Sequence, residues 1–183
     1  MSGATLGLVG VGSIGSEVAK SAAALGMDVI ATRQDPRKAM PEGVRKVFAT
    51  NELTQMLAES DYVVLAAPVT ASTQKIINEK CLAAMKPNAC LINVGRGVLV
   101  DETALVNALR SKKIAAAALD VFEKEPLPQD SPLWDMENVL ITPHTAGLTD
   151  KLWERQYAIF SENLKRFMNG QPLLAVVDKQ KGY

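Results

Sequence analysis

Residues 5–15 read TLGLVGVGSIG, an apolar run followed by glycines spaced as G-x-G-x-x-G. The apolar run predicts a strand and the residues after Gly12 predict a helix, so the glycines lie in the turn between them. Gly10 permits a tight turn, Gly12 lets a ligand approach the backbone, and Gly15 lets helix and strand pack closely. Because backbone N–H groups at the positive end of a helix attract phosphate, this segment predicts a binding site for the pyrophosphate of a dinucleotide.

Outside this segment, short apolar runs alternate with longer amphipathic runs along most of the chain. This alternation is typical of parallel strands joined by right-handed helical crossovers. The apolar runs predict strands at residues 5–9, 28–32, 45–48, 62–66, 89–93, 115–120 and 139–142. The sequence therefore predicts an α/β protein of the Rossmann type, a doubly wound parallel sheet with helices on both faces, plus a long C-terminal helix.

Two of the amphipathic runs predict helices with defined ends. The first predicts a helix over residues 13–25 that stops at Gly26 and buries a face formed by Ile14, Val18, Ala22 and Leu25. The second predicts a helix that begins after Asp101, a good N-cap, and buries Leu105 and Leu109. Both helices are expected to cover the sheet.

A last helix is predicted over residues 149–169, with an apolar stripe formed by Trp153, Tyr157, Phe160, Leu164 and Phe167. Two interpretations stay open: the stripe packs on the core of its own domain, or it packs on a partner or a missing lobe. Residues 173–177 predict a strand that has nothing local to pair with. We therefore divide the chain into a dinucleotide-binding domain, residues 1–148, and a C-terminal helix and tail, residues 149–183.

Composition and charge argue against several classes of protein. The 183 residues are 48% apolar and carry 20 basic and 20 acidic side chains, so the formal net charge is zero. A nucleic-acid binder needs a basic surface and a bilayer-spanning helix needs about 20 apolar residues, so neither is predicted. No secretory signal is visible after Met1, which predicts a cytoplasmic protein. One histidine and two cysteines that are not spaced as C-x-x-C argue against metal sites and disulfides.

The residues after the second predicted strand bear on which dinucleotide binds. Such sites place Asp or Glu there for the ribose hydroxyls of NAD, or Arg for the 2′-phosphate of NADP. This chain has Thr32 and Arg33 at that point, with Arg37 and Lys38 as further donors. A guanidinium can donate two hydrogen bonds to one phosphate, so Arg33 favours NADP, with NAD second. In the alternative interpretation, Asp35 accepts from the ribose hydroxyls and NAD binds.

Three later segments, residues 93–101, 119–127 and 142–147, each follow a predicted strand and carry ionisable side chains. The carboxyl ends of parallel strands form the ligand crevice in doubly wound sheets. We therefore expect these side chains to converge there: Arg96, Asp120, Glu125 and His144. An imidazole can donate a proton near neutral pH and a guanidinium matches a planar carboxylate, which suits reduction of a carbonyl beside a carboxylate.

Together these segments resemble the D-isomer-specific 2-hydroxyacid dehydrogenase family, over nearly the whole chain from Leu6 onward. The resemblance implies a reversible reduction of a 2-oxo acid to a D-2-hydroxy acid by a nicotinamide cofactor. It implies that Arg96 grips the substrate carboxylate, that His144 is the acid/base and that Glu125 orients this histidine. Asp120 matches the aspartate near the nicotinamide. The resemblance also implies cofactor contacts at Ser13, Ile14, Pro68, Thr73, Val94 and Ala146.

The chain departs from this family at its start, because almost nothing precedes Thr5 where family members have a substrate lobe. That lobe helps to bind the substrate and to exclude water. The chain alone is therefore expected to bind cofactor but turn over poorly, with a homodimer partner or the missing lobe beside it. Two functions stay open: an NADP-preferring reductase of small 2-oxo acids such as glyoxylate or hydroxypyruvate, and a catalytically weak module that senses dinucleotides through association.

Overall fold

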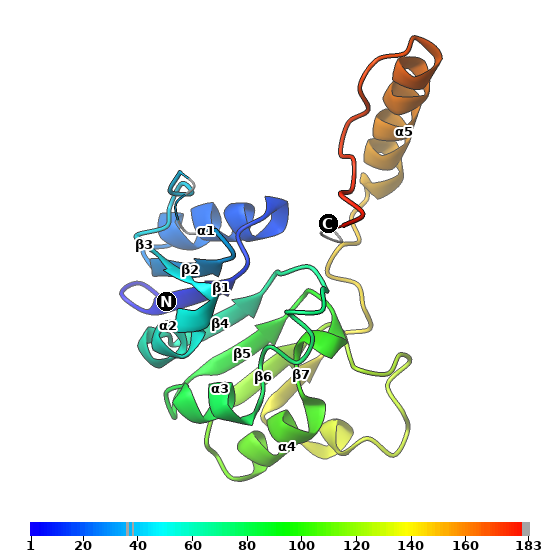
Figure 1. The fold of residues 1–183 in the computed structure, drawn as a ribbon. Coiled ribbons are helices and arrows are strands. Elements are labelled where there is room, and N and C mark those ends of the chain that lie inside the picture. Colours follow the sequence, from blue (N-terminus) through cyan, green and yellow to red (C-terminus); the bar gives the residue numbers. More distant parts are fainter. Residues whose placement is uncertain (36, 38, 181–183) are drawn as a thin grey trace. The chain divides into compact units, whose positions relative to one another are not determined.

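The structure is a computed structural model that describes residues 1–35, 37 and 39–180. The chain forms two compact units, Met1–Pro143 and His144–Tyr183. The first unit contains the sheet, and the second contains a long helix and the tail (Figure 1). Among the helices in the described ranges, none is long and apolar enough to cross a lipid bilayer.

The first unit is built, in the residues that the structure describes, around a seven-stranded sheet (Figure 1). Its strands are β1 (Thr5–Val9), β2 (Asp28–Arg33), β3 (Lys46–Ala49), β4 (Tyr62–Leu65), β5 (Cys90–Asn93), β6 (Ala116–Leu119) and β7 (Val139–Ile141). Their order is β3-β2-β1-β4-β5-β6-β7 and every pairing is parallel. The strand order reverses between β1 and β4, the switch point where doubly wound sheets bind ligands. The predicted doubly wound parallel sheet is confirmed.

Helices cover both faces of this sheet, as predicted. They are α1 (Ser13–Ala24), α2 (Leu53–Glu59), α3 (Glu79–Ala84) and α4 (Glu102–Arg110), and short 3₁₀ turns lie at Thr50–Glu52, Gly97–Leu99 and Pro132–Asp135. Successive residues of a strand face opposite sides, so Leu8 and Val9 belong to two different buried clusters. The cluster of Leu8 contains Ala19 and Ala22 of α1, and the cluster of Val9 contains side chains of α2, α3 and α4.

The buried face of α1 matches the predicted one in part: Ala22 is buried, and Val18 is half-buried against the same cluster. Gly15, Ala19 and Ala22 are its buried residues, whereas Ile14 and Leu25 are 59% and 58% exposed. Small residues face the sheet because the turn before α1 brings the helix very close: a Cβ on Gly15 would overlap a backbone carbonyl oxygen. Ile14 and Leu25 therefore lie off this face.

The predicted ends of two helices are confirmed. Gly26, just after the end of α1, has a φ of 79°, a left-handed conformation that glycine adopts without strain. At the start of α4, Oδ1 of Asp101 accepts a hydrogen bond of 3.1 Å from the backbone N–H of Ala104. Leu105 and Leu109 of α4 are buried, as predicted.

The second unit consists of α5 (Leu152–Met168) and the tail (Figure 1). No residue of α5, all of which the structure describes, is buried, so its own unit leaves the apolar stripe uncovered. The predicted strand at residues 173–177 is wrong, because side chains of α5 bind the tail instead. Asn163 donates to the carbonyl oxygen of Leu174 (3.2 Å) and accepts from its N–H (2.8 Å), and Arg166 donates to the carbonyl oxygen of Pro172 (3.2 Å). These bonds satisfy backbone groups that a neighbouring strand would otherwise satisfy.

Candidate functional site

The predicted site residues of the first unit lie at one edge of the sheet. All strands are parallel, so their carboxyl ends meet there. Residues that end or follow β1, β2, β4, β5 and β6 include Gly10, Arg33, Pro68, Val94, Arg96 and Asp120. The sheet thus brings together segments that are far apart in the sequence.

The turn after β1 has the geometry that its glycines predict. Gly10 has a φ of 96°, and a Cβ there would lie 2.8 Å from the Cα of Ala67. A Cβ on Gly15 would overlap the carbonyl oxygen of Gly10. A Cβ on Gly12, in contrast, would meet nothing within 4 Å. The fold itself therefore requires glycine at positions 10 and 15, whereas Gly12 keeps space open beside the backbone.

The start of α1 is suited to an anion. Gly12 is the N-cap and has no side chain that could accept a hydrogen bond from the first N–H groups of α1. The described first turn of α1 contains no acidic side chain. The first N–H groups of a helix have no intrahelical partner, so those of Ser13 and Ile14 can donate to phosphate oxygens at the positive end of the helix dipole. A dinucleotide pyrophosphate fits this position.

The end of β2 bears on the ribose side of the cofactor. Thr32 is 3% exposed, whereas Arg33 is half-buried and donates from Nη2 to a carbonyl oxygen of the following loop (3.1 Å). Asp35 accepts from Nε (2.9 Å) and Nη2 (3.3 Å) of Arg37, and this hydrogen bonding raises the pKa of Arg37. The carboxylate of Asp35 is thus engaged by a neighbouring cation. Lys38, a further predicted donor, lies outside the described residues.

The loop after β4 is held by its own polar groups. The hydroxyl of Thr73 accepts from the N–H of Thr70 and donates to the carbonyl oxygen of Pro68, both at 2.7 Å. Thr73 therefore shapes the loop in which Pro68 lies. Contacts of these two residues with the cofactor stay predictions.

Residues 94–99, here called the Arg96 turn, are shaped by a residue that sequence reasoning missed. Asn93 ends β5 and is 1% exposed. Its Nδ2 donates to the carbonyl oxygen of Arg96 (3.0 Å) and its Oδ1 accepts from the N–H of Gly95 (3.1 Å). The side chain of Arg96 itself is exposed and donates from Nη1 to the carbonyl oxygen of Gly95 (2.7 Å). A polar side chain at the end of a buried apolar strand was the available signal, because buried polar groups are normally hydrogen-bonded.

Residues 122–125, here called the Glu125 segment, lie directly against the Arg96 turn. A Cβ on Gly97 would overlap the backbone carbonyl of Phe122, so the two segments can approach this closely only because residue 97 is glycine. Within the Glu125 segment, Oε1 of Glu125 accepts a hydrogen bond of 3.0 Å from the N–H of Phe122. The carboxylate is thus held by the backbone of its own segment.

Three further predicted residues remain: Asp120 follows β6, and His144 and Ala146 lie in the second unit. Asp120 is 5% exposed, and its Oδ1 accepts from the hydroxyl of Thr142 at 2.6 Å. His144, with a φ of 54°, and Ala146 belong to the second unit. The convergence of His144 with Arg96 and Glu125 therefore stays a prediction.

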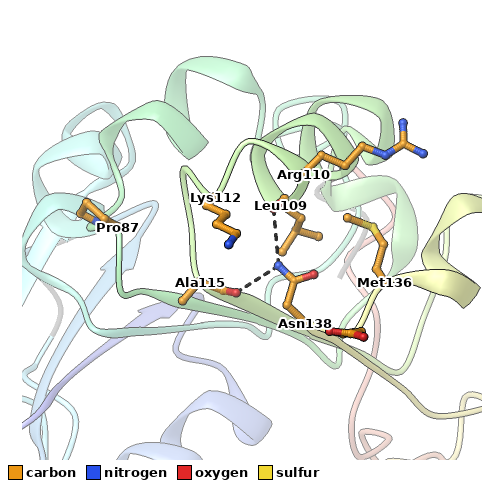
Figure 2. A pocket seen from close by; sticks show the side chains of 8 residues that line it. Pro87, Leu109, Arg110, Lys112, Ala115, Met136 and Asn138 are labelled. Carbon is orange, nitrogen blue, oxygen red and sulfur yellow. Dashed lines mark hydrogen bonds between the residues drawn. The ribbon is translucent and has the colours of Figure 1, made fainter.

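A pocket of about 520 Å³ lies away from these residues (Figure 2). Its lining residues are Pro87, Leu109, Arg110, Lys112, Ala115, Met136, Glu137 and Asn138. Ala115 and Asn138 directly precede β6 and β7, which places the pocket at the amino ends of these strands. Nδ2 of Asn138 donates to the carbonyl oxygens of Ala115 (3.1 Å) and Leu109 (3.5 Å). The pocket is therefore distinct from the predicted cofactor site at the carboxyl ends.

A doubly wound parallel sheet with a glycine turn at its switch point defines the class of dinucleotide-binding domains. Comparison with known families narrows this class. A sequence model described as "D-isomer specific 2-hydroxyacid dehydrogenase, NAD binding domain" matches residues 1–146. The chain therefore belongs to the D-isomer specific 2-hydroxyacid dehydrogenase family.

Known proteins resemble this chain in sequence and in structure. The glyoxylate reductase of Korarchaeum cryptofilum is 42% identical over 173 residues, which cover 92% of this chain and 50% of that protein. A D-isomer specific 2-hydroxyacid dehydrogenase from Xanthobacter autotrophicus Py2, in complex with NADPH and MES, has a TM-score of 0.91 at 41% identity and covers 98% of this chain and 73% of that one.

A second solved structure is nearly as similar. The NADPH-dependent glyoxylate/hydroxypyruvate reductase of Sinorhizobium meliloti, in complex with NADP and sulfate, has a TM-score of 0.90 at 35% identity and covers 98% of this chain and 57% of that one. The chain spans about half the length of most curated relatives that it matches.

Proposed function

We propose that this chain is the cofactor-binding part of a cytoplasmic, NADP-preferring reductase that transfers hydride between nicotinamide and a small 2-oxo or 2-hydroxy acid such as glyoxylate or hydroxypyruvate. The proposal rests on the open space beside Gly12 at the start of α1, because this space can accommodate the pyrophosphate of a dinucleotide. The relatives named above support it. In this role residues 1–148 bind the dinucleotide, and residues 149–183 pack on a substrate lobe.

The remaining cofactor contacts follow the carboxyl edge of the sheet. The pyrophosphate lies on the turn of Gly10, Gly12 and Gly15, where the N–H groups of Ser13 and Ile14 can donate to it. The nicotinamide half is expected to contact Pro68, Thr73, Val94, Asp120 and Ala146. The buried carboxylate of Asp120, already held by a hydroxyl, has a fixed orientation for an amide donor.

The preference for NADP rests on the position of Arg33 and on the hydrogen bonds that Asp35 makes with Arg37. Arg33 ends β2, where the adenosine ribose of a dinucleotide is bound in this fold. Asp35 is engaged by Arg37, so it is poorly placed to accept from a ribose hydroxyl. The two hydrogen bonds that a guanidinium can donate to a 2′-phosphate therefore favour NADP over NAD.

The bound nicotinamide supplies or accepts the hydride. Arg96 binds the planar carboxylate of the substrate, and its permanent charge stabilises negative charge that develops on the neighbouring carbonyl oxygen. His144 donates a proton to that oxygen, and Glu125 orients the imidazole and stabilises its protonated form. The hydrogen bonds of Asn93 hold the turn from which Arg96 projects.

Titration of NADPH and NADH against the wild type and Arg33→Asp tests the cofactor assignment. Loss of a charge-assisted pair costs about 1.5–3 kcal/mol, so Arg33→Asp is expected to weaken NADPH about ten- to hundredfold and NADH far less. Arg110→Asp, the same charge change at the opposite edge of the sheet, is the matched control. Equal loss of both nucleotides in Arg33→Asp, or none, would contradict the 2′-phosphate role.

The uncovered apolar stripe of α5 favours a second candidate function, a dinucleotide-sensing module that acts through association. Oxidation of NADPH in the presence of glyoxylate, by the chain alone and supplied with an amino-terminal substrate lobe, separates the two. A reductase shows turnover that His144→Ala abolishes. A sensing module shows NADPH-dependent oligomerisation by light scattering without turnover in either arrangement.

A further inference from the structure

Lys75 has an unusual backbone conformation at the edge of the predicted site. Its φ is 48°, in the left-handed region that residues with a Cβ rarely occupy. The N–H of Lys75 donates to the carbonyl oxygen of Val98 in the Arg96 turn (2.8 Å). Ile77 continues this contact, because its N–H donates to Leu99 (3.0 Å) and its carbonyl accepts from Asp101 (2.9 Å). The backbone around Lys75 is thus bonded along the segment that follows Arg96.

The side chain of Lys75 reaches two carboxylates on two other segments. Its Nζ lies 3.7 Å from Oδ2 of Asp101 and 3.5 Å from Oε1 of Glu123. Asp101 is the N-cap of α4. Glu123 belongs to the Glu125 segment, and its N–H donates to Oε2 of Glu102 in the first turn of α4 (3.2 Å). One ammonium group therefore lies between α4 and the Glu125 segment.

We propose that Lys75 is a positioning residue that ties the Glu125 segment to the Arg96 turn; the catalytic meaning of this role rests on the proposed function. Three segments that carry predicted site residues meet at Lys75: its own loop with Thr73, the Arg96 turn and the Glu125 segment. Strained backbone conformations persist where the surrounding structure holds them, and they cluster at functional sites. Lys75 acts through Glu125, whose carboxylate is bonded to the backbone of the segment that Lys75 holds.

The chain offers a matched control in Lys112. Lys112 also has a left-handed backbone, with a φ of 55°, but it lies in the turn before β6 and lines the pocket at the opposite edge of the sheet (Figure 2). Substitutions at both lysines therefore make the same chemical change in the same backbone conformation. Only those at Lys75 are expected to loosen the Glu125 segment.

Amide hydrogen exchange followed by NMR tests this role in the chain itself. The probes are the amide protons of Phe122 and Glu123, which are bonded to carboxylates, and that of Leu91 in the sheet core. Lys75→Met keeps the aliphatic stem and removes the charge, and it is expected to speed exchange at Phe122 and Glu123 about two- to fivefold while Leu91 is unchanged. Lys75→Arg should restore the slow exchange, and Lys112→Met should change none of the three rates.

Lys75→Gly distinguishes a local effect on the Glu125 segment from a change in the free energy of unfolding of the whole chain. Glycine relieves the left-handed backbone, so this variant is expected to loosen Phe122 and Glu123 without lowering the free energy of unfolding. Unchanged exchange at Phe122 and Glu123 in both Lys75→Met and Lys75→Gly, or an equal acceleration at Leu91, would overturn the proposal. So would an equal effect of Lys112→Met on the Glu125 segment.

The functional readout compares kcat for glyoxylate with the Kd for NADPH. In the enzyme completed with a substrate lobe, Lys75→Met is expected to lower kcat for glyoxylate while the Kd for NADPH stays within about twofold of the wild type. A lowered affinity for NADPH with kcat unchanged would contradict a role through Glu125. Failure of the wild type to bind NADPH would reject the proposed function, whereas the exchange rates still decide whether Lys75 holds the Glu125 segment.

Discussion

Gly12 and Gly15 belong to one glycine motif, the first as the N-cap of α1 and the second inside this helix, yet substitution by alanine is expected to affect different properties at the two positions. At Gly15 the added Cβ overlaps the carbonyl oxygen of Gly10, so helix and turn must separate by about 1 Å to restore an ordinary contact. Overpacking of this kind costs about 1–3 kcal/mol of stability. At Gly12 the Cβ meets nothing within 4 Å, and the backbone φ of −87° is one that alanine adopts readily. Gly12→Ala is therefore expected to cost less than about 1 kcal/mol, the loss of a preferred N-cap residue.

Dinucleotide binding should respond in the opposite way. The Cβ of Gly12→Ala occupies the space in which the pyrophosphate meets the N–H groups of α1, and each hydrogen bond to a charged group is worth about 1.5–3 kcal/mol. We expect NADPH affinity to fall at least tenfold in Gly12→Ala. Urea unfolding followed by circular dichroism gives the stabilities, and calorimetric titration of NADPH gives the affinities. Wild-type affinity in Gly12→Ala would refute the placement of the pyrophosphate, and wild-type stability in Gly15→Ala would refute the close approach.

Three further predictions concern single side chains. Asn93→Ala leaves the N–H of Gly95 and the carbonyl of Arg96 without their buried partner and should cost about 1–3 kcal/mol in urea unfolding; an unchanged midpoint would contradict this. A hydrogen bond from Lys86, and then one from the N–H of Thr5, lowers the pKa of Asp61, so its stabilisation is present above the ordinary pKa of about 3.9 and is lost as the pH falls further. Unfolding free energy should therefore fall less steeply below about pH 4 in Asp61→Asn than in the wild type, and parallel curves would argue against it. Asn163→Ala should speed proteolysis within residues 171–180, because Asn163 makes two hydrogen bonds to Leu174; an unchanged cleavage rate would exclude this anchoring role.

The sheet was predictable because its strands are short apolar runs bounded by turn residues, and all seven predicted strands are present in the described part of the chain. The face of α1 was predictable only in part, because the helix lies so close to the turn before it that Gly15 faces inward, whereas the large side chain of Ile14 is exposed. The tail was misassigned because Asn163 and Arg166 supply hydrogen-bond partners that the apolar pattern of residues 173–177 does not reveal.

For the site, sequence spacing predicted which segments reach the carboxyl edge but not how each is held there. Asn93 was overlooked because its role is to bond backbone groups of its neighbours, and a motif does not display such bonds. The contact of Gly97 with Phe122 likewise joins residues that no periodicity relates. The approach of His144 to Glu125 stays a prediction.

The position of β1 in the strand order also bears on how the chain folds. Five of the six strand pairings in the described sheet join strands that are consecutive in the sequence. The sixth joins β1 to β4, which are not consecutive. There Leu6 pairs with Tyr62, although β2 and β3 lie between them in the sequence. Distant pairings form late because closing a long loop is entropically costly. We therefore expect β1 to β3 and β4 to β7 to pair within themselves first. The pairing of β1 with β4 is then expected to be the rate-limiting step of folding.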